Sequence, residues 1–150
     1  PAPATPAPPA NVNAPLDVMR EARVAQDAAE QLSRMLHNAE VNAQLIALVQ
    51  ARPNPDPDSL NQYRASEQTI ERSIIDSETG YLLAAKRLGK ADPDALRVAF
   101  DKLEDEVSSA GIGWRTKLAQ LVRGHVLKVQ AFDTRVDADF REQLRGLQKN

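Results

Sequence analysis

The sequence predicts an all-α protein, an antiparallel up-down bundle of four helices, the third one short, behind an extended Pro/Ala-rich N-terminal tail. Three observations support this fold class. Apolar and small residues recur at alternating spacings of three and four, as in helices that bury one face. Segments rich in proline or glycine interrupt this pattern, and short connections favour antiparallel neighbours. No run of alternating apolar and polar residues bounded by turns predicts a sheet.

Residues 1–16 form the tail, and residues 17–150 form one bundle domain. The tail begins PAPATPAPPANVNAP, a composition that favours extended polyproline II structure, so we expect a semi-rigid spacer. Such spacers are frequent just outside the bacterial cytoplasmic membrane, which favours a periplasmic or other extracytoplasmic location; a cytoplasmic linker is the alternative. Because the chain opens at Pro1, we expect a preceding segment, with a signal peptide, lipid anchor or membrane helix as candidates.

The first helix is expected over residues 17–51. Its apolar seam is rich in alanine, so a neighbouring helix can approach closely along the first half. We expect Met35, Leu45, Leu48 and Val49 to widen the buried stripe near the far end. Prolines within residues 52–57 end this helix. The seam consists of Val18, Ala22, Ala25, Ala29, Leu32, Leu36, Ala39, Ala43 and Ile46.

The second helix is expected to start at a cap on Asp58 or Ser59 and to end near Gly89. Gly80 lies inside its pattern at a cost of about 1 kcal/mol relative to alanine, so residues 76–81 are a helix or, alternatively, a kink or loop. Two members of the seam are polar. The seam consists of Leu60, Tyr63, Glu67, Ile70, Ile74, Ser77, Tyr81, Ala84 and Leu88.

The third helix is predicted to begin at Asp92, with Pro93 at its first position, and to end before residues 111–113. Two glycines in that segment favour a tight reversal of the chain. The alternative is that the third and fourth helices continue into each other as one long helix. The last helix is expected from Trp114 to about Leu147. Its spacing shifts after Val136, which resembles a coiled-coil stutter. The two seams consist of Leu96, Phe100, Leu103, Val107 and Ala110, and of Leu118, Val122, His125, Val129, Phe132 and Val136, followed by Phe140, Leu144 and Leu147.

Composition argues against several classes of function. The formal net charge is -2, which provides no basic excess for nucleic acid. The chain has no cysteine, which excludes disulfides, thiolate nucleophiles and zinc–thiolate sites. No stretch reaches the roughly 18 apolar residues of a spanning helix, so we expect no membrane insertion by this segment.

We expect no enzyme, no cofactor and no metal. His37, Glu40 and His125 are candidates for a metal site in a bundle core, but di-metal bundles place histidine three residues after glutamate, on two helices, and here the order is reversed and occurs once. Residues 111–113 lack the strand and the Lys-Ser or Lys-Thr of a phosphate loop. Glu67 is a single carboxylate, whereas acid–base catalysis needs a paired group.

Two sets of residues are candidate sites of another kind. Tyr63, Glu67 and His125 are polar or amphipathic residues on apolar seams, which predicts a polar core or a ligand pocket between helices. Trp114, with Ile112 just before it, lies at a bundle end. It either plugs the core there or, if exposed, anchors a partner, because tryptophan is common at interface hot spots.

The stretch Ile-Ile-Asp-Ser-Glu-Thr-Gly-Tyr-Leu-Leu, residues 74–83, resembles a helical segment of the CHASE3-type extracytoplasmic sensor domains. In that family an acidic-Thr-Gly run precedes a separate Gly-Tyr-Leu-Leu run; here the two are merged and the arginine between them is missing. The resemblance implies a sensor domain of a membrane receptor. Our leading prediction is a non-catalytic protein–protein interaction module of the bacterial cell envelope that acts through exposed helix faces and is capable of homo-oligomerisation. The alternative is an extracytoplasmic, ligand-sensing four-helix bundle.

Overall fold

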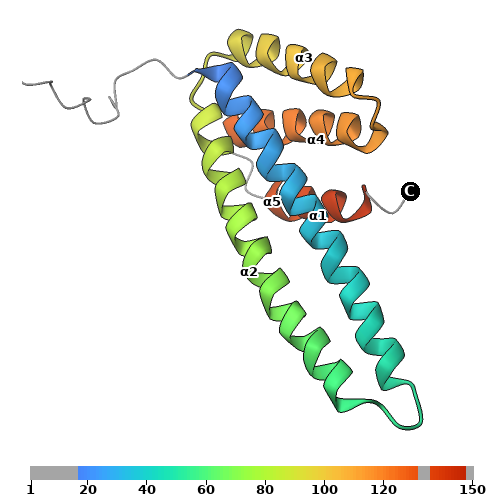
Figure 1. Cartoon of the computed structure of the whole chain (residues 1–150). Helices are drawn as coiled ribbons and strands as arrows, with labels where there is room; N and C mark the ends of the chain where they lie inside the picture. The colour runs from blue at the N-terminus through green and yellow to red at the C-terminus, as the bar shows by residue number, and fades with distance from the viewer. Residues whose placement is uncertain (1–16, 132–135, 148–150) are drawn as a thin grey trace, which may run out of the picture.

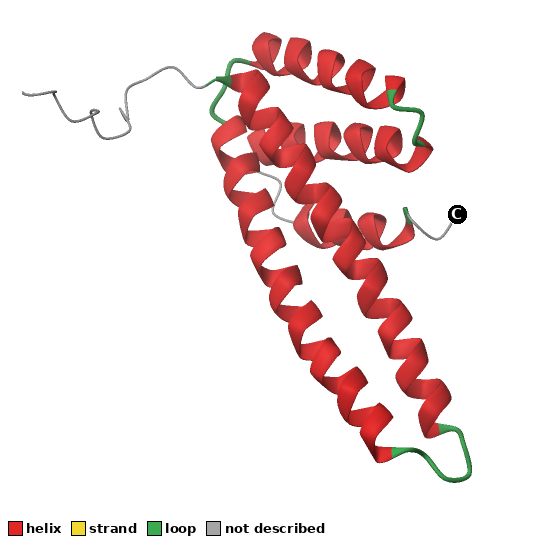
Figure 2. Ribbon diagram, viewed as in Figure 1, coloured by secondary structure: helices red, strands yellow, loops and turns green. Residues whose placement is uncertain are grey.

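The computed structural model describes residues 17–131 and 136–147, and these residues form five helices and no strand (Figure 2). The all-α prediction is therefore confirmed for this part of the chain. The Pro/Ala-rich tail, residues 1–16, lies outside the described residues. The helices are α1 (Val18–Gln50), α2 (Pro57–Leu88), α3 (Pro93–Ser109), α4 (Gly113–Gln130) and α5 (Val136–Gly146).

The two long helices form a hairpin, and the three short helices cross one half of it. α1 has 33 residues and α2 has 32, so each is about 50 Å long at about 1.5 Å per residue. Helices α3, α4 and α5 lie one below another across the half of the hairpin that contains the start of α1 and the end of α2 (Figure 1). The other half, which ends in the α1–α2 loop, projects beyond them.

This arrangement corrects the predicted four-helix, up-down bundle. The expected last helix is two helices, because α4 ends at Gln130 and α5 begins at Val136. The shift in apolar spacing that we interpreted as a stutter follows Val136, the first residue of α5, and so lies just beyond this break. Three helices are short instead of one, and they run across the hairpin instead of along its length (Figure 1).

Aspartate followed by proline starts two of the helices. Asp56 and Asp92 are N-caps whose carboxylates accept hydrogen bonds from the amides of Asp58 and Ala95, each at 3.2 Å. The next residue in each case is a proline at the first helical position, where its missing amide costs nothing. The prediction was correct at Asp92 but wrong for α2, whose cap is Asp56 and not the expected Asp58 or Ser59.

The two glycine segments behave differently. Gly111 has a φ of +74°, a left-handed conformation that favours glycine, and it reverses the chain between α3 and α4. The predicted reversal at residues 111–113 is thus confirmed, and a single long helix is excluded. Gly80 lies inside an unbroken α2, so the alternative of a kink or loop at residues 76–81 is wrong.

The hydrophobic core lies where α3, α4 and α5 cross the hairpin. On α1, Ala22, Ala25 and Ala29 are completely buried, as expected for a close helix approach along its first half. On α2, no residue before Ile74 is buried. The remaining core members come from all five helices: Leu32, Leu36, Tyr81, Ala84, Ala85, Leu88, Leu96, Ala99, Phe100, Leu103, Leu118, Val122, Val126, Phe140 and Leu144.

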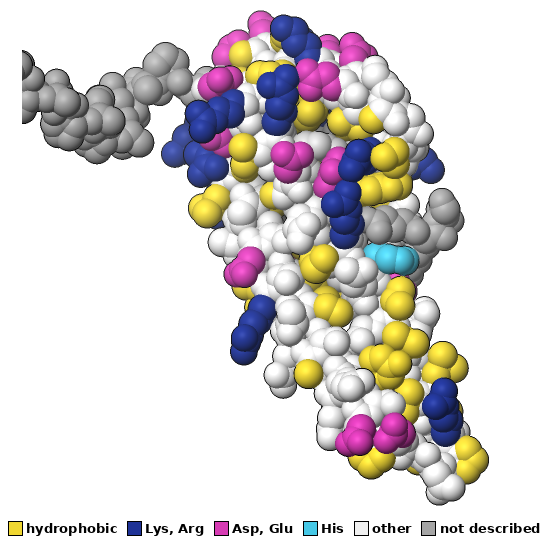
Figure 3. All heavy atoms as spheres, in the orientation of Figure 1, with side chains coloured by type: hydrophobic (Ala, Val, Ile, Leu, Met, Phe, Trp, Pro, Cys, Tyr) yellow, Lys and Arg dark blue, Asp and Glu magenta, His cyan; other side chains and the backbone are white. Residues whose placement is uncertain are grey.

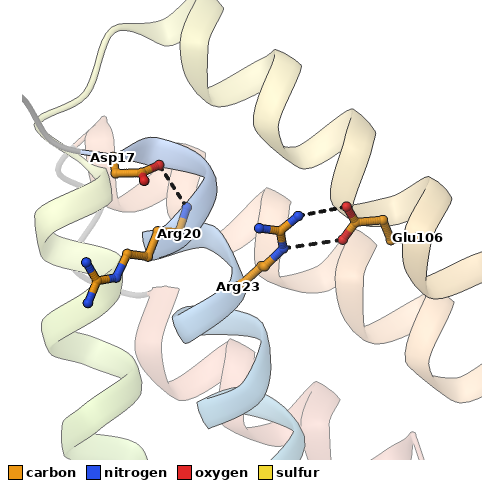
Figure 4. A network of polar contacts seen from close by, with 4 residues as sticks. All are labelled: Asp17, Arg20, Arg23 and Glu106. Carbon is orange, nitrogen blue, oxygen red and sulfur yellow. Dashed lines mark hydrogen bonds and ion pairs between the residues drawn. The ribbon is translucent and has the colours of Figure 1, made fainter.

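Ion pairs add to the core at the crossing. The Arg23 guanidinium on α1 donates to both carboxylate oxygens of Glu106 on α3, at 2.8 and 3.4 Å (Figure 4). This hydrogen bonding lowers the pKa of Glu106 and raises that of Arg23. On α2, Glu78 pairs with Arg141 of α5 at 3.2 Å.

None of the described helices is long and apolar enough to cross a bilayer.

Candidate interaction surface

Within residues 17–131 and 136–147, the projecting half of the hairpin is the part that other helices cover least. We call residues 38–70 the arm. Ion pairs and ring contacts join the hairpin to α3, α4 and α5 through Arg23, Glu30 and Arg34 of α1 and through Glu78 and Tyr81 of α2. In the arm, only Asn42 and Val49 are buried. The arm is therefore a two-helix structure held mainly by its own α1–α2 contact.

A row of aliphatic side chains is exposed along α1 in the arm. Val41 is 42% exposed, Leu45 36% and Leu48 64%, and their spacing of four and three residues places them on one face of the helix. We call these three residues the stripe. Their exposure corrects the expectation that Leu45 and Leu48 widen the buried seam; of the four residues named for that role, Val49 is buried and Met35 is partly buried.

The stripe lies on the side of the hairpin opposite to α3, α4 and α5. On α1, the residues that face α2 in the arm include Asn42 and Val49, and the stripe is about a quarter turn from them. Other residues of α1, such as Gln26 and Ser33, are buried under the three short helices. Around the axis of α1, they lie on the opposite side of the α2-facing residues from the stripe. The stripe consequently lies on a helix face that no described helix covers.

The surface around the stripe carries little charge. Residues 41–51 contain no charged side chain, although 27% of the whole chain is charged. On the same side of α2, a quarter turn from Tyr63 and Ile70, the residues are small or uncharged: Ser66, Thr69 and Ser73. Figure 3 shows hydrophobic side chains along α1 in the lower part of the hairpin, with most charged side chains on the part that the short helices cross.

One buried polar contact holds the two helices of the arm together. The side-chain amide of Asn42 on α1 donates to the backbone carbonyl of Tyr63 on α2 at 2.9 Å, and Asn42 is 7% exposed. A buried asparagine in a helix pair costs stability and selects the register in which it is satisfied. Asn42 therefore aligns α1 and α2 in a region where apolar packing is sparse.

The structure does not bring together the residues predicted for a polar core or ligand pocket. Tyr63 is partly buried in the arm, and Glu67, one turn further along α2, is exposed. The expected seam position of Glu67 is therefore wrong, as is that of Ala43 on α1, because in this region only two helices are present and each buries a narrower face. His125 lies apart from both, on α4.

His125 is buried in an aromatic cluster. It is 3% exposed; its Nδ1 shares a hydrogen bond of 2.5 Å with the Tyr81 hydroxyl, and its ring stacks on Phe140 with centroids 4.3 Å apart. Phe140 also stacks on Tyr81, at 4.7 Å. A pocket between α4 and α5 borders this cluster, and its polar lining comes from Lys128, Asp139, Gln120 and Gln143. His125 is thus buried and hydrogen-bonded to a neighbouring side chain, whereas Tyr63 and Glu67 lie apart from it in the arm.

Trp114 and Ile112 lie at the α3–α4 turn. Trp114 is partly buried and packs against the core, with the guanidinium groups of Arg34 and Arg115 each 5.8 Å from its ring centroid. Ile112 is 37% exposed. Trp114 therefore lies where it covers the end of the core, which is the first of the two roles considered for it. The exposed apolar side chain at this turn is Ile112.

A signal for the stripe was present in the sequence. Val41, Leu45 and Leu48 form a second heptad-like row beside the seam, and a helix with two such rows needs two sets of neighbours.

Among residues 17–131 and 136–147, no group of three or more histidine, aspartate or glutamate side chains is arranged to hold a metal ion. Comparisons of the chain with protein-family models, with curated proteins and with solved structures found no match.

Proposed function

We propose that this chain is a non-catalytic protein–protein interaction module that binds its partner through the stripe on the arm. The observation that carries the proposal is the exposure of Val41, Leu45 and Leu48 on a helix face that no described helix covers. Single exposed apolar residues are ordinary on protein surfaces, but an aligned, charge-free row indicates an interface. Helix faces of this kind are used to dock a partner helix.

The arm is a better candidate than the α3–α4 turn. At the turn, Trp114 is already engaged by the core and by two arginines, so only Ile112 is free to contribute apolar area. The other exposed aliphatic residues of the described chain are Val24, Ile75, Leu83, Val98 and Leu127; of these, Val98 lines an apolar hollow together with Val18 and Met19, which are partly buried. The stripe alone combines three such residues at helical spacing.

A sensing function is the second candidate, and the pocket beside His125 is the observation in its favour. Lys128 and Asp139 line this pocket with opposite charges, which suits a small zwitterionic or polar ligand. Two of the three residues predicted for a ligand site, Tyr63 and Glu67, belong to the arm and do not line it. For this reason we favour the interaction function.

A location in the bacterial cell envelope is part of the proposal. Its support is the composition of residues 1–16, which suits a spacer between a folded domain and an anchor. Fractionation of cells that naturally produce the protein tests this part: we expect the protein in the periplasmic or membrane fraction, and its recovery with cytoplasmic markers would contradict the proposed location.

Site-specific photo-crosslinking tests the interaction function directly. A photoreactive residue placed at Leu48 in cells that naturally produce the protein is expected to give a discrete adduct. The same residue at Leu83, a leucine of α2 that is 53% exposed and lies outside the arm, is the matched control. Failure to form an adduct at Leu48, or an equal adduct at Leu83, would show that the arm is not the interface.

A further inference from the structure

We infer that a cleft between α1, α3 and the start of α4 binds a small aliphatic α-amino acid in its zwitterionic form. The cleft has a volume of about 320 Å³. Ligand pockets measure about 300–1,000 Å³, so this one suits a small ligand. Its lining residues differ from those of the pocket beside His125, and it lies outside the arm. The inference therefore does not depend on the proposed function.

Gln26 of α1 forms the floor of the cleft and carries a buried oxygen without a hydrogen-bond partner. The residue lines the cleft but is only 1% exposed. Its Nε2 donates to Oε1 of Glu30 at 3.4 Å, whereas its own Oε1 accepts no hydrogen bond from any residue that the structure describes. A reversed amide would place this oxygen against the Glu30 carboxylate, so repulsion fixes the orientation. A buried acceptor without a donor costs free energy, and a ligand N–H group in the cleft would supply that donor.

Arg115, at the start of α4, contributes a donor that is left over in the same cleft. Its Nε is buried and lies 3.4 Å from Oε1 of Glu30, within ion-pair distance, but forms no hydrogen bond inside the described chain. That carboxylate oxygen already accepts from Gln26. A guanidinium binds a carboxylate well, because its N–H groups match the two oxygens. The cleft thus offers one buried acceptor and one buried donor, which correspond to the ammonium and carboxylate groups of an amino acid.

The charges of the cleft favour a ligand that carries an ammonium group. Asp27 is exposed at the rim and forms no ion pair with another residue of the described chain. The excess of one negative charge attracts an ammonium and disfavours a ligand that has only a carboxylate. The lining contains three carboxylates and two guanidinium groups: Asp27, Glu30, Glu106, Arg23 and Arg115.

Helix α3 supplies an apolar wall that faces α1 across the cleft. Leu103 is 3% exposed and Val107 is partly buried, and both line the cleft together with Ala110. An aliphatic side chain of the ligand can pack against this wall and leave water. A polar side chain would lose its hydration there without gaining a partner. The wall therefore selects amino acids with short aliphatic side chains.

A ligand can reach Gln26 by displacing exposed side chains. Arg23 precedes Gln26 by three residues and so lies on the same side of α1, where it bridges to Glu106 of α3 (Figure 4). The side chains of Arg23 and Glu106 are 53% and 51% exposed. Exposed ion pairs contribute little to stability, so these two side chains can move without a change in the helices.

NMR titration of the whole chain with three matched probes tests the site. L-leucine carries both charged groups, 3-methylbutylamine lacks its carboxylate, and 4-methylpentanoate lacks its ammonium. Leucine is expected to bind at least tenfold more tightly than either analogue, because each analogue leaves one of the two buried atoms unpaired. The side-chain signals of Gln26 and Arg115 should shift with leucine at concentrations up to about 10 mM, a range that suits so small a ligand. No shift of these signals, or equally tight binding of the amine, would overturn the inference.

Gln26→Leu removes the unpartnered oxygen with little change in size. This variant should bind leucine at least tenfold more weakly and stay folded, because a buried acceptor without a donor is exchanged for an apolar group. Gln31→Leu, on an exposed position of the same helix, is the matched control and should bind leucine as the wild type does. Unchanged binding of leucine by a folded Gln26→Leu chain would show that the oxygen belongs to no ligand site.

Arg115→Lys tests the carboxylate position independently, also if Gln26→Leu fails to fold. Lysine keeps the positive charge but lacks the Nε–H group and the planar guanidinium. We expect weaker binding of leucine and unchanged binding of 3-methylbutylamine. An equal loss for both probes would overturn the assignment of the carboxylate to Arg115. Photo-crosslinking at Leu48 reports on the arm alone, so failure of the ligand site leaves the interaction function standing.

Discussion

The Tyr81 hydroxyl of α2 and Nδ1 of His125 of α4 lie 2.5 Å apart, and this buried hydrogen bond ties the hairpin to the short helices. Phe140 of α5 stacks on both rings, so three helices meet in one cluster. Tyr81 is completely buried. The contact therefore belongs to the core and links helices that are distant along the chain.

Removal of that hydroxyl should destabilise the protein. We expect Tyr81→Phe to lower the free energy of unfolding by about 1–2 kcal/mol, because a buried hydrogen bond to His125 is lost while the ring contacts remain. The change should lower the melting temperature by about 2–4 °C for each kcal/mol. Urea unfolding measures the change in the free energy of unfolding, and Tyr63→Phe in the arm is the control. Equal changes in the free energy of unfolding for the two substitutions would show that the hydrogen bond to His125 does not stabilise the fold.

Asn42→Ala should destabilise the arm by about 1 kcal/mol relative to Asn38→Ala. Both substitutions gain the same helix propensity, but only Asn42 is buried and donates to the Tyr63 carbonyl. Hydrogen exchange of the amides in residues 38–70 measures the local effect, which is expected to exceed the change in the core. Identical exchange in the two variants would contradict a role for Asn42 in holding α1 against α2.

Two glycine substitutions should have opposite effects. Gly80→Ala should stabilise the protein by up to about 1 kcal/mol, because the position is inside a helix and no atom lies within 4 Å of an added Cβ. Gly111→Ala should destabilise it by about 1–2 kcal/mol, because its φ of +74° is strained for any residue with a Cβ. Thermal unfolding of the two variants beside the wild type gives the sign of each change. Destabilisation by Gly80→Ala would indicate that α2 bends at that position.

The Arg23–Glu106 pair should give a small, pH-dependent contribution to stability. The hydrogen bond from Arg23 lowers the pKa of Glu106, so the ionised carboxylate is favoured in the folded state. A lowered folded-state pKa adds stability that is present above the unfolded pKa, about 4.3 for glutamate, and is lost as the pH falls through the folded value. Because both side chains are exposed, the effect is modest and weakens in salt.

NMR titration of the Glu106 carboxyl group measures this pKa, and Arg23→Gln should move it back toward the ordinary value. The difference in unfolding midpoint between the wild type and Arg23→Gln should be constant near neutral pH, should begin to decline as the pH falls through the unfolded glutamate value of about 4.3, and should vanish below the lowered folded-state pKa of Glu106. A Glu106 pKa that is the same in both proteins would show that the ion pair in Figure 4 is not populated in solution.

The sequence by itself determined the helical class and most helix ends of the described chain. Asp92 with Pro93, the prolines of residues 52–57 and Gly111 act through local chemistry: a side chain that caps free amides, a ring that removes a donor, and a backbone that tolerates positive φ. Such signals need no knowledge of neighbouring helices. The alanine seam of α1 likewise predicted the close approach along its first half.

Only the tertiary structure decided which apolar rows are buried. Heptad spacing shows that Leu45 and Leu48 share a face, but whether that face meets another helix depends on where α3, α4 and α5 cross the hairpin, and that depends on connections and crossing directions. The same reason places Glu67 in solvent and His125 in the core, although the spacing assigns both to apolar seams. Periodicity defines the faces of a helix, whereas the number of neighbours determines how many of those faces are covered.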